Sequence, residues 1–176
     1  MNIPNSLTVI RILLVPLFIW TFFHLSPEYA YVPVLLLLLS GLTDIADGFI
    51  ARKFHMITPL GRFLDPVADK LTICTAIICL SLRHQIVWIL VGIYVVKEVT
   101  LALIGLARLK SWRNSIAAKW YGKASTVLLY ILMLSIMLFP TISDRVILIL
   151  MIPPVIFIIL SFIFYLKEIN IHKKEL

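Results

Sequence analysis

The sequence predicts an all-α, polytopic integral membrane protein with six transmembrane helices and a short interfacial N-terminal segment. The 176-residue chain is 61% hydrophobic and only 14% charged, whereas a soluble domain is usually near half apolar and a quarter charged. The apolar residues gather into six stretches, each near the ~20 residues that a helix needs to cross a bilayer. No fixed-period repeat or long linker divides the chain, so residues 1–176 are expected to form a single membrane domain.

Short polar connections separate these apolar stretches. Residues 2–6 carry Pro4 and polar caps, which suits a segment lying in the membrane interface. Pro16 is expected to kink the first helix, and the adjacent Pro153 and Pro154 are expected to break or bend the last one. The predicted spans run from Leu7 to His24, Val32 to Ile50, Phe63 to Leu82, Ile86 to Leu106, Tyr121 to Phe139 and Val146 to Leu166.

Basic residues in the connections predict the orientation in the membrane. The formal net charge is +7, and the basic side chains concentrate after the second and fourth stretches and at the C-terminus. By the positive-inside rule, both termini then face the cytoplasm in a multi-pass protein of the cell membrane. Basic residues placed at a membrane surface favour membrane lipids and other phosphate-bearing partners, and they argue against nucleic acid.

Four aspartates stand out between residues 44 and 69, and we refer to them as the aspartate cluster: Asp44, Asp47, Asp65 and Asp69. The first two are three residues apart and the last two are four apart, so each pair shares a helix face. A short basic connection joins the two helices, which makes them antiparallel neighbours. The two pairs are therefore expected to face each other near the cytoplasmic membrane surface.

Four converging carboxylates need a counter-charge in a low-dielectric site. The natural one is one or two hard divalent cations, Mg²⁺ or Mn²⁺. A structural ion pair with arginine or lysine is the alternative for any single aspartate. An alternative from another class is a membrane cation or proton transporter, because acidic clusters also line cation pathways. The single acidic face and the absence of an inverted repeat in the sequence favour a site over a pathway.

The aspartate pattern resembles the signature of the CDP-alcohol phosphatidyltransferase family. Residues 2–16 are similar to the opening segment of the phosphatidylglycerophosphate synthase and cardiolipin synthase branches of that family. The resemblance fades after about Leu82. The matching signature positions are Asp44, Asp47, Gly48, Ala51, Arg52, Gly61, Asp65 and Asp69.

The resemblance implies a metal-dependent transfer reaction. An alcohol hydroxyl attacks the β-phosphoryl group of CDP-diacylglycerol, and CMP leaves. All four members of the aspartate cluster are implied as metal ligands, with Asp69 also acting as the catalytic general base. Base and ligand roles for Asp69 are not exclusive. Family members commonly form homodimers, so a homodimer is implied here.

CDP-lipid contacts are expected from small and polar residues around the aspartate cluster. Small residues on the first acidic helix would open a slot for the nucleotide, and a nearby arginine would contact it or its phosphates. Polar residues three apart on the first helix form a second group that includes Arg11; two of them are expected to reach the pyrophosphate, with ordinary capping as the alternative. The expected contacts are Asn5, Thr8, Gly48, Ala51, Arg52 and Gly61.

The leading acceptor is glycerol 3-phosphate, whose phosphate needs a basic pocket. Lys97-Glu98 stands where the phosphatidylglycerophosphate synthase branch has Arg-Glu, and Gly105 stands where that branch has a second arginine. These departures leave phosphatidylglycerol open as the acceptor, which would make the protein a cardiolipin synthase. The candidate residues for the acceptor phosphate are Lys97, Arg108, Lys119 and Lys123.

Overall fold

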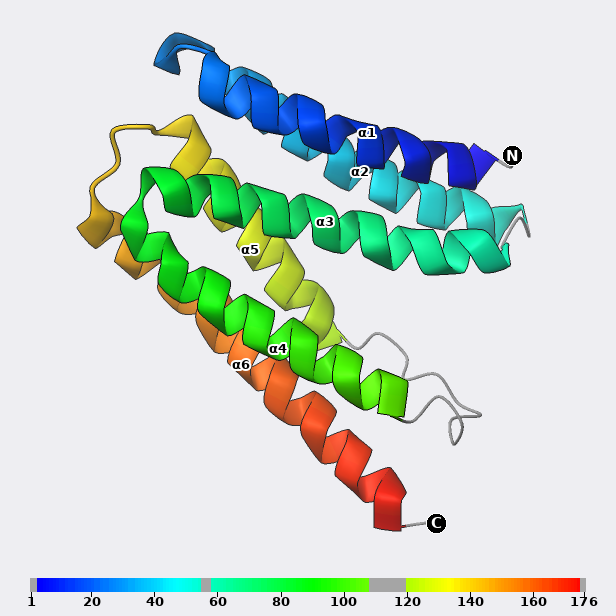
Figure 1. Ribbon diagram of the computed structural model, residues 1–176. Coiled ribbons are helices and arrows are strands. Elements are labelled where there is room, and N and C mark those ends of the chain that lie inside the picture. The colour runs from blue at the N-terminus through cyan, green and yellow to red at the C-terminus, as the bar shows by residue number, and fades with distance from the viewer. Residues whose placement is uncertain (1–2, 55–57, 108–119, 175–176) are drawn as a thin grey trace. The chain divides into compact units, whose positions relative to one another are not determined.

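The computed structural model describes residues 3–54, 58–107 and 120–174, and these ranges contain helices and no strand (Figure 1). The predicted all-α class is therefore confirmed for the described part of the chain. The elements follow one another as α1 (Ile3–His24), η1 (Pro27–Tyr29), α2 (Tyr31–Lys53), α3 (Pro59–Arg83), η2 (Gln85–Val87), α4 (Trp88–Ala107), α5 (Trp120–Leu138) and α6 (Asp144–Lys174), with η marking short 3-10 helices.

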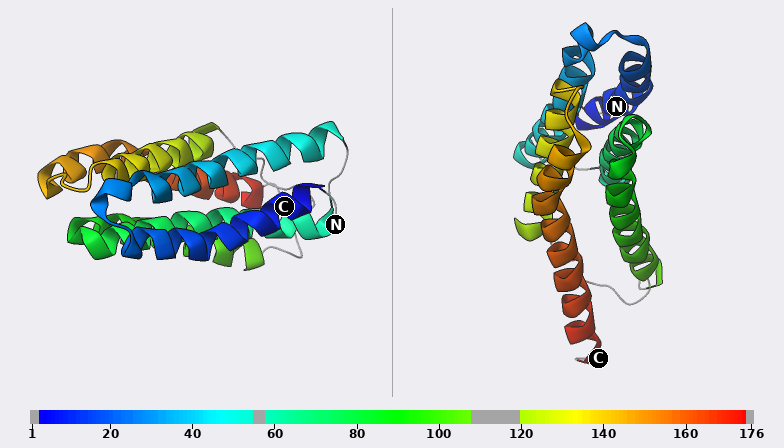
Figure 2. Two further views of the ribbon diagram at one scale, coloured as in Figure 1. Left: turned by 90° about the horizontal axis from the view of Figure 1, so that it is seen from above. Right: turned by 90° about the vertical axis from the view of Figure 1, so that its left-hand side faces the viewer.

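The helices form two compact units, of which the first comprises residues 1–83 and 133–141 and the second residues 84–132 and 142–176. In the first unit, α1 packs against both α2 and α3, and α2 also contacts α3. Successive helices of this trio run antiparallel, as the views in Figures 1 and 2 show. The prediction of one continuous domain is not tested by this division and stays a prediction.

The trio owes its packing to apolar residues at helical spacing. Leu37, Ile73, Ala76 and Ile77 are almost fully buried, and Phe18 of α1 joins them. Close van der Waals packing of such side chains stabilises contacts between membrane helices, because lipid tails leave no hydrophobic driving force between them. The core lies toward the middle of the helices, which leaves their polar ends free to build a site.

The N-terminal residues extend the first helix. Helix α1 begins at Ile3 and continues without interruption to His24, so the expected interfacial segment over residues 2–6 is, in its described part, the first turn of α1. Pro4 is compatible with this position because the first backbone N–H groups of a helix have no intrahelical partner.

The last helix is predicted to break or bend at Pro153 and Pro154. It does not break, because α6 runs through both residues, and the bend stays a prediction. Proline removes one helical hydrogen bond and crowds the preceding turn. The residues on both sides of the pair are an apolar run, and in hydrocarbon their backbone groups have no water to bind. A continuous helix therefore lets the remaining backbone N–H and C=O groups of this segment form hydrogen bonds with each other.

Five helices of the described chain are long and apolar enough to cross a membrane: α1, α2, α4, α5 and α6. A multi-pass membrane protein is therefore confirmed, whereas the count of six spans is not. The exception, α3, has 25 residues but carries Asp65, Asp69 and Lys70 in its first half. Two of these charged residues, Asp65 and Asp69, belong to the aspartate cluster.

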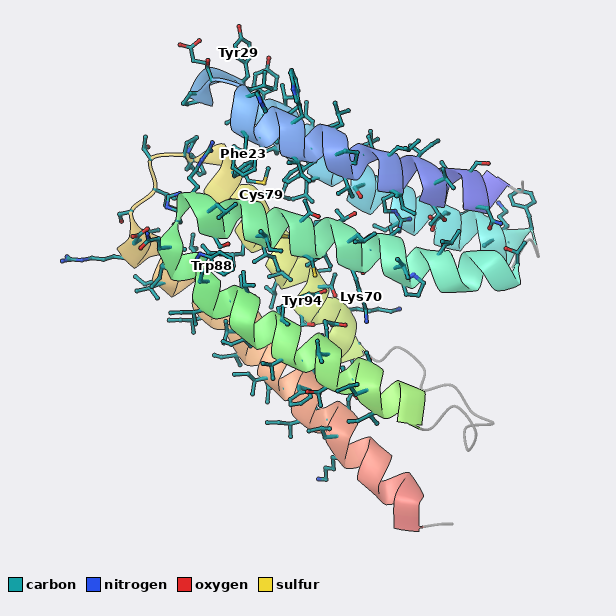
Figure 3. The ribbon with its side chains drawn as sticks, in the orientation of Figure 1. Phe23, Tyr29, Lys70, Cys79, Trp88 and Tyr94 are labelled. Atoms are coloured by element: carbon teal, nitrogen blue, oxygen red, sulfur yellow. The ribbon has the colours of Figure 1, made fainter. Side chains whose placement is uncertain are left out.

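In the second unit, α4 packs against α6, and η2 contacts both of them. Tyr121 of α5 stacks against Phe164 and Tyr165 of α6, with ring centroids 5.2 and 5.5 Å apart. Across both units the outward side chains are largely apolar, for example Phe23 and Trp88 (Figure 3). Exposed apolar helix faces of this extent are expected of a protein surrounded by lipid.

Candidate active site

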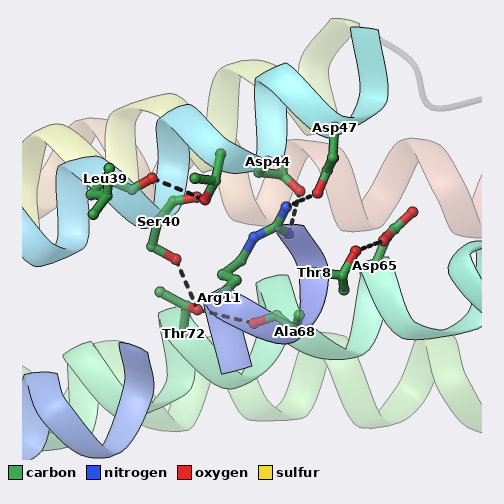
Figure 4. A network of polar contacts seen from close by, with 10 residues as sticks. Thr8, Arg11, Leu39, Ser40, Asp44, Asp47, Asp65, Ala68 and Thr72 are labelled. Carbon is green, nitrogen blue, oxygen red and sulfur yellow. Dashed lines mark hydrogen bonds and ion pairs between the residues drawn. The ribbon is translucent and has the colours of Figure 1, made fainter. Parts of the chain in front are cut away.

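The two aspartates of α2 converge on one guanidinium group from α1. Nη1 of Arg11 donates to Oδ1 of Asp44 at 2.5 Å, and Nη2 donates to Oδ2 of Asp47 (Figure 4). Only 1% of the Arg11 side chain is exposed. Asp47 is nearly as buried, whereas 42% of the Asp44 side chain is exposed. Arg11 and Asp47 of this ion-pair triad are therefore shielded from the surroundings, whereas Asp44 is accessible.

Helix periodicity explains why α2 presents both carboxylates together. Residues three apart in an α-helix lie on one face, so Asp44 and Asp47 point the same way, as predicted from their spacing. The planar guanidinium offers a fork of N–H donors that matches two carboxylates at once. A charged group in a membrane span is expensive unless it is paired, which is why Arg11 can be buried here.

A second side chain of α1 reaches the next acidic helix. The hydroxyl of Thr8 donates to Oδ1 of Asp65 on α3 at 2.5 Å, and Thr8 is fully buried. Thr8 and Arg11 are three residues apart on α1, so they project from one face at successive turns. Helix α1 thus contacts the acids of α2 and of α3 with one polar stripe, which Figure 4 shows.

The same stripe ends at Asn5, which ties α1 to the start of α3. Oδ1 of Asn5 accepts a hydrogen bond from the hydroxyl of Thr58 at 3.0 Å, and that hydroxyl accepts one from the backbone N–H of Gly61 at 2.9 Å. A Cβ atom at position 61 would lie 2.6 Å from Oδ1 of Asn5. Gly61 is therefore required by the close approach of the Asn5 amide, as well as by any ligand.

Replacing Gly61 by alanine tests this close approach. Alanine in a helix is usually more stable than glycine by up to ~1 kcal/mol, but here the methyl group must displace the buried Asn5 amide and break its bond to Thr58. We expect Gly61→Ala to lower the melting temperature. The matched control is Gly92→Ala on α4, where a Cβ atom meets nothing within 4 Å, so the melting temperature should stay equal or rise. Equal behaviour of the two variants would contradict the contact.

A polar layer lies one turn deeper in the bundle. Ser40 of α2 and Thr72 of α3 place their hydroxyl oxygens 3.3 Å apart, and the Thr72 hydroxyl donates to the carbonyl of Ala68 at 3.0 Å (Figure 4). Both side chains line a small cavity together with Arg11 and apolar neighbours. Within the described residues, Nε of Arg11 has no hydrogen-bond partner.

The fourth aspartate, Asp69, and the small residues of the signature lie on α2 and α3 near the contacts described above. Asp69 lies on α3 one turn after Asp65 and is half-buried, on the helix face that the spacing predicts. Gly48 and Ala51 are half-buried on α2. The side chain of Arg52 lies outside the described part, so its predicted nucleotide contact stays a prediction.

The predicted acceptor residues belong to the second unit. Nζ of Lys97 lies 3.1 Å from Oε1 of Glu98 and 5.8 Å from the ring centroid of Tyr94, so Lys97 has an ion-pair partner on its own helix. Lys123 is exposed on α5. Arg108 and Lys119 lie outside the described residues.

The donor chemistry of the site suits a hard divalent cation, since Asp44, Asp47 and Asp65 offer only carboxylate oxygens and interact electrostatically with one another. Where the structure describes side chains, however, no three histidine, cysteine, aspartate or glutamate residues are close enough together to hold one ion. The carboxylates of α2 turn toward Arg11, and that of Asp65 turns toward Thr8. Arg11 thus provides a positive charge to Asp44 and Asp47, which is the ion-pair alternative considered for single aspartates in the sequence.

Sequence reasoning gave no role to several residues of this network. Arg11 and Thr58 bind the predicted site residues directly, and Ser40 and Thr72 form the layer behind them. Two signals could have found them. An arginine inside an apolar span demands an acidic partner, and Ser40 precedes Asp44 by one helical turn, on the same face.

Comparison with known proteins identifies the family of this chain. A family model described as CDP-alcohol phosphatidyltransferase matches residues 1–166. This range includes the aspartate cluster and the residues of α1 that contact it. A relative from Haemophilus influenzae named CDP-diacylglycerol–glycerol-3-phosphate 3-phosphatidyltransferase is 32% identical over 133 residues, covering 71% of this chain and 69% of the relative.

Two further relatives carry the same name. The Escherichia coli K12 protein is 30% identical over 133 residues, covering 71% of this chain and 70% of its own length. The Rickettsia bellii protein is 42% identical over 85 residues, and that match covers 48% of this chain and 47% of the relative.

Proposed function

Because the chain belongs to the CDP-alcohol phosphatidyltransferase family, we propose that it transfers the phosphatidyl group of CDP-diacylglycerol to glycerol 3-phosphate and releases CMP. The name of its relatives supports this acceptor. The observation that carries the proposal is the gathering of Asp44, Asp47 and Asp65 around one polar face of α1. The family comparisons favour this transferase over the transporter considered from the sequence.

The aspartate cluster would hold the divalent cation on which the family generally depends. We propose that Asp44, Asp47, Asp65 and Asp69 supply the carboxylate oxygens, and that the ion is Mg²⁺ or Mn²⁺. When bound, such an ion neutralises pyrophosphate oxygens and the negative charge on the leaving CMP.

Asp69 is the proposed general base. In the transfer step, the acceptor hydroxyl oxygen forms a bond to the β-phosphorus, the bond from that phosphorus to CMP breaks, and Asp69 takes the hydroxyl proton. Its position one turn beyond Asp65 supports this role, because the base then lies next to the carboxylates that would hold the divalent ion. The half-buried site lowers competition from water.

The CDP end of the donor is assigned to residues around the same face. Gly48 and Ala51 lack bulk and would leave room for the nucleotide, while Arg52 would pair with its phosphates. Asn5 and Thr8 already lie beside α3 through Thr58 and Asp65. Their hydroxyl and amide groups are the donors that could turn toward a pyrophosphate, and Gly61 lets the Asn5 amide lie against the start of α3.

The acceptor phosphate is assigned to Lys97, Arg108, Lys119 and Lys123. Lys97 is held by Glu98 in the structure, so a phosphate would have to compete for its charge. This observation favours phosphatidylglycerol as the second candidate acceptor, because a phosphodiester carries less charge than a terminal phosphate and needs fewer cations. The protein would then be a cardiolipin synthase.

Product analysis with competing acceptors tests the proposal. The full chain in detergent would receive CDP-diacylglycerol with labelled glycerol 3-phosphate, phosphatidylglycerol, inositol phosphate or serine, each with Mn²⁺, Mg²⁺ or a chelator. We expect CMP release and labelled lipid with glycerol 3-phosphate only, and only with a divalent ion. Consumption of phosphatidylglycerol with glycerol 3-phosphate left unused would overturn the acceptor, and no CMP release with any acceptor would overturn the transferase.

The site is further proposed to face the cytoplasm of a homodimeric cell-membrane protein. The basic ends of α2 and α3, which include Lys53, support this orientation through the positive-inside rule. Reagents that label introduced cysteines only from outside the cell should not modify position 53, and cross-linking in membranes should trap two chains. Labelling at 53 or only monomers would contradict the respective proposal.

A further inference from the structure

A buried arginine occupies the centre of the aspartate cluster, and its charge has no role in the transfer chemistry above. Arg11 is 1% exposed and, among the described residues, forms its ion pairs with Asp44 and Asp47. We propose that the Arg11 guanidinium is the built-in counter-ion of these two aspartates, and that a divalent cation must compete with it to bind them. The inference rests on the metal site proposed above and adds a residue that sets the affinity of that site.

Electrostatics explains why a counter-ion is needed at all. Two carboxylates one turn apart within a membrane helix repel each other, and neither is easily kept ionised without a positive charge nearby. A guanidinium remains charged at every physiological pH. Arg11 therefore offsets the negative charge of Asp44 and Asp47 and orients both carboxylates toward α1.

Competition follows from the atoms involved. The guanidinium binds one oxygen of each carboxylate, and a divalent ion in contact with those carboxylates would lie beside a like charge. Like charges a few ångströms apart repel each other in a site that is largely shielded from water, so Arg11 must lower the affinity for the ion unless it moves away.

The structure supplies both an approach for the ion and some freedom for the arginine. Asp44 is the exposed end of the triad, so an ion can reach its carboxylate first. Nε of Arg11 has no partner in the described part of the chain, and Arg11 shares a small cavity with Ser40 and Thr72. The hydroxyl groups of Ser40 and Thr72 can accept hydrogen bonds from the Arg11 guanidinium if it moves away from Asp44.

The test is the Mn²⁺ dependence of thermal stability in the full chain. Wild type, Arg11→Met and Arg11→Lys would be stripped with a chelator, titrated with Mn²⁺ in detergent, and melted at each concentration. We expect Arg11→Met to melt at a lower temperature without Mn²⁺ and to reach half of its stabilisation at a Mn²⁺ concentration about tenfold lower than wild type. Arg11→Lys should shift in the same direction by less, since an ammonium keeps the charge and loses the fork.

Arg83→Met is the matched control. Arg83 lies at the other end of α3, roughly 27 Å from Asp65 by helix rise, and its guanidinium binds the carbonyl of Phe22 at 3.3 Å and stacks on the Phe22 ring. Its loss removes one arginine from the first unit without touching the aspartates, so its Mn²⁺ midpoint should equal that of wild type.

The outcomes separate the two proposals. If Mn²⁺ stabilises every variant with the wild-type midpoint, or Arg11→Lys requires more Mn²⁺ than wild type, the competition by Arg11 is wrong while the metal site survives. If Mn²⁺ stabilises none of the proteins, the metal site itself is wrong. Should Arg11→Met not fold without Mn²⁺, the direction of the Arg11→Lys midpoint decides.

Discussion

Replacing Asp69 by asparagine is expected to reduce CMP release by about 10²–10⁴-fold, the usual contribution of a positioned general base. Asparagine keeps the size of the side chain but accepts no proton, so the acceptor hydroxyl would attack without assistance. The rate would be measured as CMP released from CDP-diacylglycerol with saturating glycerol 3-phosphate. Melting temperature would be measured alongside, and a change of more than a few degrees would show that the substitution also disturbs the fold.

The control for this variant is Asp144→Asn at the start of α6. The Asp144 side chain is 64% exposed and its carboxylate lies 3.3 Å from Nδ1 of His84, so water can replace this contact and its contribution to stability is small. This control should release CMP at the wild-type rate. A wild-type rate for Asp69→Asn, with the control equally active, would remove Asp69 from the reaction.

Loss of Asp47 is expected to cost far more stability than loss of Asp44. Asp47→Ala leaves the buried guanidinium of Arg11 with one carboxylate instead of two, and breaking a buried ion pair usually costs about 3–5 kcal/mol. In a chain of this length that corresponds to a fall in melting temperature of about 10 °C. The measurement is thermal unfolding in detergent with a chelator, which keeps any metal contribution out of the comparison.

Asp44→Ala provides the internal comparison within the same triad. The Asp44 side chain is 42% exposed, so water can replace part of the hydrogen bonding that Arg11 loses in this variant. The expected fall in melting temperature is about 3 °C. Both variants remove one carboxylate bonded to the same arginine. Equal falls would contradict the view that Arg11 depends more on the buried carboxylate of Asp47 than on the partly exposed carboxylate of Asp44.

Local periodicity accounts for what the sequence predicted correctly. Runs of about 20 apolar residues predicted the helices because length and hydropathy decide membrane insertion, and the spacing of Asp44 and Asp47 placed both on one face of α2. The short connection between α2 and α3 likewise predicted that these helices are antiparallel neighbours. Each of these features depends on residues close together in the chain.

Features that depend on distant residues were predicted less well. Arg11 bonds to residues 33 and 36 positions away, and no local pattern states which face of α1 meets α2. The need for Gly61 likewise comes from Asn5, which lies two helices earlier in the chain. Continuation of α6 through Pro153 and Pro154 depends on the apolar surroundings of the backbone. The need for internal hydrogen bonds there outweighs the energetic cost of proline inside a helix.

The acceptor pocket was the least predictable part. Lys97 could be recognised as a charge in an apolar stretch, but its pairing with Glu98 depends on rotamers that the sequence does not fix. Charges that belong to a ligand site and charges that merely satisfy each other look alike in a sequence. The acceptor therefore rests on chemistry to be measured with the competing substrates above.

The central claim is that acids from α2 and from α3 act together on one divalent ion. The most direct measurement is the number of Mn²⁺ ions bound per chain, determined by electron paramagnetic resonance of free Mn²⁺, for wild type, Asp44→Asn and Asp65→Asn. We expect wild type to bind Mn²⁺ and each single variant, whether on α2 or on α3, to lose at least about tenfold in affinity. Unchanged binding in either variant would show that the two helices do not share a metal site.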